Sequence, residues 1–244
     1  DEKLSSFFIH ANGGTSSLPR PAAEVDKELA IHGLSVVEIE AKGGKWTYNA
    51  ASPFNRRVTT MSEVQISGPA KGSPHLVTKF SPDATRARGT LNNCGTGKTP
   101  WGTLVSGEEN WFGYFHRDAK DDERRGKKNP QVAGLIRYGR PAGAASRHGW
   151  ESAGADDKYL RWNNGATGAS ASADYRNEMN TFGFVVEMDP YDGQKLVKKR
   201  TGLGRFAHES VSFAKPVAGQ PIVGYMGDDA RMEYMYKFVS ATKC

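Results

Sequence analysis

The chain has 244 residues, of which 25% are charged, and a formal net charge of +6, so it is long enough to bury a substantial hydrophobic core. Its basic residues are spread along the chain, which argues against a nucleic-acid partner, and no segment approaches the roughly 20 apolar residues of a membrane span. The first residues, DEKLSSFF, lack the basic and apolar regions of a signal peptide, and two cysteines cannot form a disulfide framework.

One segment near the start predicts a helix. In PAAEVDKELAIHG (21–33) apolar residues recur on one helix face, and Gly33 is a typical C-terminal stop. Most later segments are short, rich in β-branched and aromatic residues, and bounded by turn residues, as strands are. They are LSVVEIE (34–40), KWTYNA (45–50), EVQISG (63–68), GTLVSGEENWFGYF (102–115), GFVVEMD (183–189), PIVGYMGDD (221–229) and MEYMYKFV (232–239). The series predicts an all-β sandwich, barrel or propeller.

Three segments predict loops. RPAGAASRHGWESAGADD (140–157) and NNGATGASASADYRN (163–177) are small, polar and glycine-rich, which suits either a functional loop or a disordered insertion. In KDDERRGKKNP (120–130) acids alternate with bases before a turn signal, and we expect a solvated loop there. None of these segments marks a clear boundary, so we expect a single domain over residues 1–244.

The tripeptide GKT at residues 97–99 raises the question of a nucleotide-binding P-loop. That motif requires a glycine five residues before Gly97, where this chain has Asn92. It also requires a helix that opens at the lysine, whereas Pro100 follows Thr99 directly and the next residues read as extended. We therefore exclude a P-loop.

Acidic residues recur in or beside the predicted strands. Clustered carboxylates repel one another and are costly to desolvate unless a cation neutralises them, so a cluster would predict hard cations bound by oxygen. Taken singly, each of these acids is more often a solvated residue at the end of a strand. The segments are SGEENW with Glu108, Glu109 and Asn110, FVVEMDP with Glu187, RFAHES with His208 and Glu209, and YMGDD with Asp228 and Asp229.

Cys94 has two interpretations. Free cysteine is commonly a small buried hydrophobe, but the polar, glycine-rich residues on either side of Cys94 suit ligand binding better. A thiolate beside carboxylates would favour iron or zinc over calcium. A serine hydrolase using His208 or His148 lacks a GxSxG elbow, and His208 and Glu209 do not begin an HExxH motif.

The longest motif carries a family resemblance. GTLNNCGTGKTPWGTLVSGEENWFGYF (89–115) is similar to the NNC, TPWGT and EEN signature of PhoX-type alkaline phosphatases. The similarity runs in one order from about His32 to Ser240 and is broken mainly by the two polar loops. The further segments are HGLSVVEIE (32–40), NRRV (55–58), ISGPAKG (66–72), FGFVVEMDPYD (182–192), KKRTGLGRFAHES (198–210) and YMGDDARMEYMYKFVS (225–240).

The resemblance implies an exported enzyme, periplasmic or secreted, that hydrolyses small-molecule phosphomonoesters on a six-bladed β-propeller. It implies Fe³⁺ and Ca²⁺ as cofactors, with Cys94 as an iron ligand, Glu187 as a metal-binding carboxylate and Asn110 as a phosphate contact. Period-two alternation places Glu108 on the same strand face as Asn110, so we expect Glu108 rather than Glu109 to be a ligand. Glu209 and Asp228 are extrapolated as further metal ligands. The cations would act as Lewis acids and as a source of nucleophile.

Three departures from the family pattern shape the expectations. FFIHANGG around His10 matches the family's NHEY segment poorly, no twin-arginine signal is present, and the later R-P-E motif has no counterpart. We therefore expect a middle piece or a shortened relative, with a partial propeller and weak activity alone. A non-catalytic calcium-binding or interaction module is the alternative function. The physiological ester and the oligomeric state are left open.

Overall fold

A computed structural model describes residue 10 and residues 17–244 of the chain. These residues are mostly β with few helices, which confirms the expected class, but no sheet among them closes on itself, and the propeller stays a prediction. The comparison of FFIHANGG with the family pattern lies, apart from His10, outside the described residues. None of the helices in the described part of the chain is long and apolar enough to cross a bilayer.

The chain divides into two compact units, each assembled from three separate segments. Unit 1 comprises Asp1–Ile31, Lys71–Arg86 and Asn110–Phe182, and unit 2 comprises His32–Ala70, Ala87–Glu109 and Gly183–Cys244. The single domain over residues 1–244 stays a prediction.

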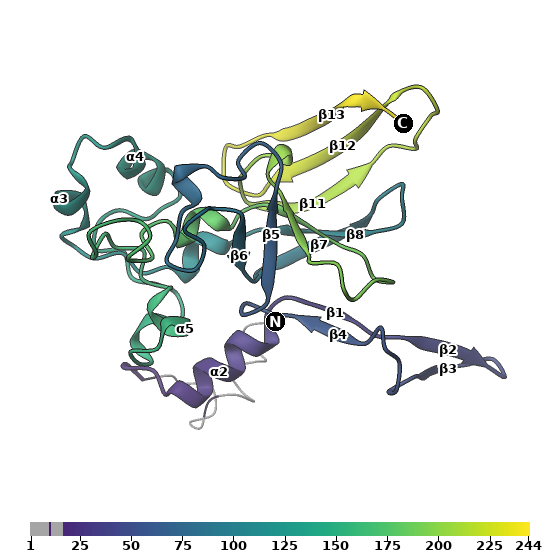
Figure 1. The fold of residues 1–244 in the computed structure, drawn as a ribbon, viewed down its shortest axis with the longest axis horizontal. Helices are drawn as coiled ribbons and strands as arrows, with labels where there is room; N and C mark the ends of the chain where they lie inside the picture. The colour runs from purple at the N-terminus through teal and green to yellow at the C-terminus, as the bar shows by residue number, and fades with distance from the viewer. Residues whose placement is uncertain (1–9, 11–16) are drawn as a thin grey trace. The chain divides into compact units, whose positions relative to one another are not determined.

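Unit 2 contains most of the predicted strands (Figure 1). Its largest sheet has six strands in the order β6-β5-β10-β9-β8-β7, with β10 parallel to β5 and antiparallel to β9. A second sheet pairs β11, β12 and β13 in antiparallel order, and β1 with β4 and β2 with β3 form two-stranded ribbons. The strands are β1 (Leu34–Val36), β2 (Ile39–Lys42), β3 (Lys45–Tyr48), β4 (Arg56–Val58), β5 (Glu63–Ser67), β6 (Arg86–Arg88), β7 (Asn93–Lys98), β8 (Leu104–Glu108), β9 (Val185–Met188), β10 (Lys198–Arg200), β11 (His208–Phe213), β12 (Pro221–Asp228) and β13 (Met235–Lys243).

Glycines allow β11 to lie against β7 and β8. A Cβ atom on Gly97 would lie 2.3 Å from the Val211 carbonyl oxygen, and one on Gly107 would lie 2.3 Å from that of His208. No side chain fits in such a space, so these positions accept only glycine. The hydrophobic core beside this contact contains Val105, Val185, Phe206, Val211 and Met226. The GKT residues thus end strand β7, and no helix follows them, which confirms that they are not a P-loop.

Unit 1 contains the α-helices, and fewer of its elements than those of unit 2 are predicted from the sequence. The predicted helix is confirmed as α2 (Ala22–Ile31), and Gly33 follows it with φ of +108°. The expected strand 102–115 is wrong beyond Glu108, because residues 111–114 form the 3₁₀-helix η2. The other elements are η1 (Pro74–Leu76), α3 (Asp121–Arg125), α4 (Pro130–Arg137), η3 (Trp150–Ser152), α5 (Asp157–Leu160), η4 (Glu178–Thr181) and, in unit 2, η5 (Thr201–Leu203).

The expected solvated loop at residues 120–130 is confirmed only in part, because residues 126–128 are exposed but residues 121–125 form the helix α3. Asp121 is fully buried, and its Oδ2 atom lies 2.6 Å from Arg117 Nε and 2.7 Å from Arg125 Nε. Its Oδ1 atom accepts a hydrogen bond from the Ala166 amide at 2.7 Å. Burial alone would raise the pKa of Asp121, but these partners outweigh it and the pKa is lowered. The charge run therefore supplies a buried ion-pair network.

The two polar segments 140–157 and 163–177 contribute to the core of unit 1. Trp150 is fully buried, and its ring centroid lies 4.8 Å from that of Trp162 and 5.1 Å from that of Tyr114. Glu28 of α2 accepts hydrogen bonds from Trp150 Nε1 and from Arg20. Since a disordered insertion would not supply a central core residue, the disorder interpretation fails for residues 140–157.

Candidate metal centre

The candidate site of unit 2 lies where several strands end. Cys94 is the second residue of β7, and Glu109 follows the last residue of β8 directly. Glu209 is the second residue of β11, and Asp229 follows the end of β12. Because β11 packs on β7 and β8 and pairs with β12, these strand ends lie together.

Three carboxylates converge at this position. Glu109, Glu209 and Asp229, here named the acidic triad, each offer an oxygen atom, and the three atoms lie within 4.8 Å of one another. Glu109 is half-buried, whereas Glu209 and Asp229 are exposed. Like charges this close repel, and a cation bound by oxygen would remove the repulsion. The triad therefore has the donor chemistry of a hard cation site.

Cys94 adds a thiol to the acidic triad. A hydrogen bond to the Glu109 carboxylate, with partial burial and the negative charges of Glu109 and Glu209, raises the pKa of the Cys94 thiol to about 11. The thiol is therefore protonated at neutral pH in this environment. A cation on the same carboxylates would reverse the effect and favour the thiolate, which is the form that binds metals.

Glu108 lies in a different environment from Glu109. It is fully buried, and its Oε1 atom accepts hydrogen bonds from Lys199 Nζ and Thr90 Oγ1, each at 2.8 Å. Its Oε2 atom accepts from the amides of Gly183 and Phe184 at 3.0 and 3.1 Å. Glu108 thus joins β8, β10 and the start of β9 from inside the protein.

Glu187 also has its own partners. Its Oε1 atom accepts from Thr103 Oγ1 at 2.6 Å and Trp101 Nε1 at 2.8 Å, and its Oε2 atom lies 2.6 Å from Arg200 Nε. Burial would raise the pKa of Glu187, but the hydrogen bonds from Arg200, Thr103 and Trp101 outweigh burial and lower it. Neither Glu108 nor Glu187 is a member of the acidic triad.

The remaining predicted residues lie close to the acidic triad in the sequence. The Oδ1 atom of Asp228 accepts hydrogen bonds from the amides of Ala207 and Ala230, at 3.3 and 3.1 Å, and so supports the start of the turn that follows β12. Asn110 is half-buried and begins unit 1, and its carbonyl oxygen accepts from the Gly113 amide at 3.2 Å. A phosphate contact by Asn110 stays a prediction.

His208, one of the histidines weighed for hydrolysis, lies in the core of unit 2. His208 is fully buried, its ring stacks on Phe206, and its Nε2 atom lies 3.2 Å from the Gly204 carbonyl oxygen. Burial lowers the pKa of His208 to about 4, so the ring is neutral at pH 7. His208 therefore supports the core under the strand that carries Glu209.

Sequence reasoning singled out Glu109 and Asp229 without preferring them as ligands, and it missed Lys199 and Arg200, which form ion pairs with Glu108 and Glu187. The alternation argument placed Glu108 and Asn110 on one strand face, but β8 ends at Glu108, so the argument did not apply beyond it. The sequence signal for the ion pairs of Lys199 and Arg200 was the KKR sequence of β10. Neighbouring residues of a strand face opposite sides of the sheet, so these two basic residues can neutralise two separate acids.

The fold and the site together define a mostly β protein with a candidate metal centre of oxygen and sulfur donors. The family model described as alkaline phosphatase PhoX matches residues 10–244. The chain belongs to the PhoX alkaline phosphatase family.

One solved structure shows the similarity in three dimensions. It is Pseudomonas fluorescens PhoX in complex with vanadate, a transition state analogue, which is 34% identical to this chain with a TM-score of 0.76. The match covers 98% of this chain and 37% of that one, so this chain spans little more than a third of its length. No curated protein matches the chain at a significant level.

Proposed function

We propose that this chain carries the thiol and carboxylate part of a metal-dependent site that hydrolyses small-molecule phosphomonoesters. The observation that carries the proposal is the convergence of the acidic triad with the Cys94 thiol in a member of the PhoX family. The vanadate complex of the Pseudomonas fluorescens protein supports it, because that protein binds an analogue of a phosphoryl-transfer transition state. The proposed ligands are Cys94, Glu109, Glu209 and Asp229.

The donors present fit the cations that the resemblance implies. Carboxylate oxygens suit calcium, and a thiolate among them suits ferric iron. The hydrogen bond between Cys94 and Glu109 supports this assignment, because it brings the sulfur atom to one member of the acidic triad. Ferric iron and calcium, when bound, would supply Lewis-acid neutralisation of the phosphate oxygens and an activated nucleophile.

The chain's own residues have distinct proposed roles. The acidic triad and Cys94 hold the cations, and Asn110, directly after Glu109, donates its side-chain amide to a phosphate oxygen. Glu108, fixed by Lys199 and two backbone amides, holds the end of β8 in place, so that Glu109 instead of Glu108 is the ligand. By the same reasoning Asp228 supports the turn and Asp229 is the ligand.

Architecture and location follow the same proposal. We propose that the sheets of unit 2 are consecutive blades of the six-bladed β-propeller that the resemblance implies, with the acidic triad at the ends of their strands. We also propose a periplasmic or secreted location. Accessibility of the protein to protease added to intact cells, or to cells with a permeabilised outer membrane, tests the location.

The proposed function is tested by metal analysis and phosphate release on the same samples. The chain is incubated with Fe³⁺ and Ca²⁺, desalted, analysed for bound metal, and assayed with p-nitrophenyl phosphate. Cys94→Ser is expected to lose iron and hydrolysis together while its circular dichroism is unchanged, because an alcohol is a far poorer donor than a thiolate. Cys244→Ser is the matched control and keeps both.

The outcomes separate the proposal from its alternative. Retention of iron and hydrolysis by Cys94→Ser overturns the assigned ligand. Calcium binding that depends on Glu109 without any phosphate release, at any metal composition, supports the non-catalytic calcium-binding module instead.

A further inference from the structure

Unit 2 contains a cavity of about 400 Å³ that the proposed hydrolysis does not use. It opens between the six-stranded sheet and the sheet of β11, β12 and β13, beside Val105 of β8. Cys94 and Glu109 lie at the other end of the β7–β8 pair, where Asn93 pairs with Glu108. The volume is within the range of small-molecule binding sites.

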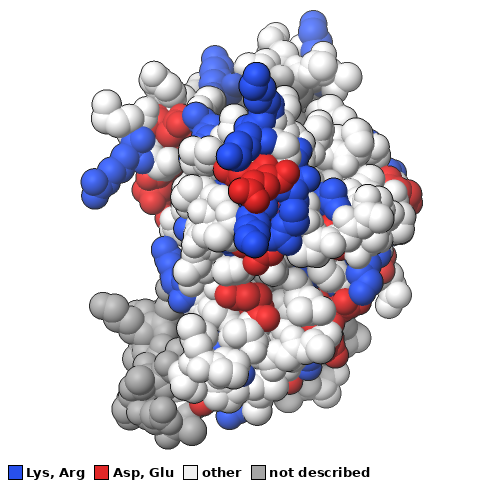
Figure 2. Space-filling model, turned by 90° about the vertical axis from the view of Figure 1, so that its left-hand side faces the viewer, with Lys and Arg blue, Asp and Glu red and all other residues white. Residues whose placement is uncertain are grey.

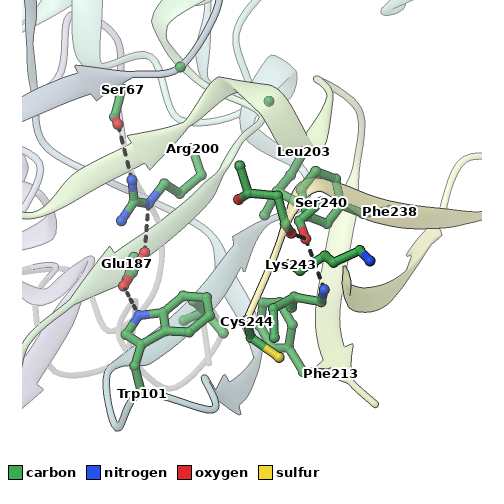
Figure 3. A pocket seen from close by; sticks show the side chains of 15 residues that line it. Ser67, Trp101, Glu187, Arg200, Leu203, Phe213, Phe238, Ser240, Lys243 and Cys244 are labelled. Atoms are coloured by element: carbon green, nitrogen blue, oxygen red, sulfur yellow. Dashed lines mark hydrogen bonds and ion pairs between the residues drawn. The ribbon is translucent and has the colours of Figure 1, made fainter. Parts of the chain in front are cut away.

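The cavity has an apolar aromatic part. Trp101 and Phe213 contact each other edge to face, with ring centroids 5.8 Å apart, and Phe238, Leu203 and Ile222 extend the same surface. Figure 3 shows Phe213 and Phe238 across the cavity from Glu187 and Arg200. Such walls favour an aromatic ring, because ring pairs gain stabilisation beyond the area they bury.

The opposite wall presents a guanidinium with donors to spare. Of the five N–H groups of Arg200, one donates to Glu187 at 2.6 Å and one to Ser67 Oγ at 3.1 Å. Arg200 makes no other side-chain hydrogen bond with the described residues, and its side chain is 33% exposed. Trp101 and Thr103 orient Glu187, so the whole polar wall is held in one geometry.

The charges of the lining select an anion of low charge. Among the side chains of the lining, Glu187 neutralises Arg200, and Lys243, which has no acidic partner among the described residues, adds one positive charge. A cation would be repelled by Lys243. Repulsion from the Glu187 carboxylate grows with the charge of an anion on Arg200, so a monoanion is favoured over a phosphate dianion. Arg forms paired hydrogen bonds with carboxylates.

We propose that this cavity binds a small aromatic carboxylate, with its ring against Trp101 and Phe238 and its carboxylate on Arg200. The site is separate from the acidic triad and does not depend on the proposed hydrolysis. It would retain its ligand in a chain that has no phosphatase activity.

Isothermal titration calorimetry with 1-naphthoate tests the proposal. We expect saturable binding of one equivalent, with an affinity at least tenfold above that for the neutral analogue 1-naphthalenemethanol. Phe238→Trp, which fills the cavity, is expected to lower the affinity at least tenfold, and Phe54→Trp, a matched change away from the cavity, leaves it unchanged. Lys243→Glu reverses a charge at an exposed position and should also weaken binding. It tests the proposal even if Phe238→Trp does not fold.

Three results would overturn the proposal. The first is equal affinity for the acid and the alcohol, which would make the cavity a non-selective apolar site. The second is unchanged naphthoate binding in folded Phe238→Trp and in Lys243→Glu, which would place the ligand elsewhere. The third is tighter binding of 1-naphthyl phosphate than of 1-naphthoate, which would make the cavity part of phosphate-ester recognition.

Discussion

Replacing Lys199 by Met is expected to destabilise the protein by about 3–5 kcal/mol, the usual result of breaking a buried ion pair from one side. Lys199 and Glu108 are both fully buried, and their charged atoms lie 2.8 Å apart. Removing the ammonium group leaves the Glu108 carboxylate with three neutral donors, from Thr90, Gly183 and Phe184, and no countercharge. The volume of the side chain hardly changes, so the cost is electrostatic.

Urea unfolding followed by circular dichroism measures this cost. For a slope of about 2–3 kcal/mol per molar urea, the midpoint of Lys199→Met should fall by roughly 1–2 M. The double variant Glu108→Gln with Lys199→Met should recover most of the loss, because the unpaired charge is then absent. A cost below about 1 kcal/mol for Lys199→Met would show that the ion pair contributes little to stability. A double variant less stable than Lys199→Met would show that the unpaired Glu108 charge is not the source of the cost.

Three further predictions concern the acidic triad, the close packing of strands and the buried ion pairs of unit 1. Calcium at a free concentration 100 times its dissociation constant for the acidic triad should raise the free energy of unfolding by about 2.7 kcal/mol. Glu109→Gln should abolish this gain. Glu108→Gln should lower the stability of the protein but leave the gain from calcium unchanged. Thermal unfolding with and without a chelator measures both. Gly107→Ala should lower the melting temperature and the metal content together, since its Cβ would displace β11 and Glu209; unchanged metal content would contradict this. Because the folded pKa of Asp121 is lowered, its stabilisation is present above the unfolded pKa and is lost as the pH falls through the folded value. Asp121→Asn should therefore flatten the fall in stability between pH 5 and pH 3 in urea titrations.

Much of unit 2 was predictable because its strands have local signals. Residues 63–68, 183–189, 221–229 and 232–239 show runs of β-branched and aromatic residues between turn residues, and β5, β9, β12 and β13 lie within or across them. Pairing order was not predictable, since β5 pairs in parallel with β10, and the paired residues Gln65 and Lys198 are 133 positions apart in the chain. Contacts of that range leave no local pattern.

Unit 1 was poorly predicted because its stability comes from long-range contacts between short helices. The segment around Trp150 reads as a loop of small residues, yet Trp150 is a core residue through its contacts with Tyr114 and Trp162. The charge run of 120–130 likewise looks solvated unless Arg117, outside the run, is known to pair with Asp121.

On the face shown in Figure 2, acidic and basic side chains are interspersed without a continuous basic stripe.

The candidate site was half predictable, and the reason lies in the direction of neighbouring side chains. Each candidate position holds two identical neighbouring acids, Glu108 with Glu109 and Asp228 with Asp229. Choosing the ligand within each pair requires knowing which face of the strand is buried. The ion pair of Glu108 with the buried Lys199 supports Glu109 as the proposed ligand of the first pair. The hydrogen bonds of Asp228 with the amides of Ala207 and Ala230 support Asp229 as the proposed ligand of the second.

The same glycines that permit the packing of β11 also determine where its carboxylate lies. Gly95 and Gly97 lie one and three residues after Cys94, and Cβ atoms there would lie 2.6 Å from the Ser210 Cβ and 2.3 Å from the Val211 carbonyl oxygen, respectively. With side chains at these positions, β11 would stand away from β7, and Glu209 with it. The glycine-rich sequence around Cys94 therefore serves the site indirectly, because it lets β11 pack against β7 and so brings Glu209 to the acidic triad.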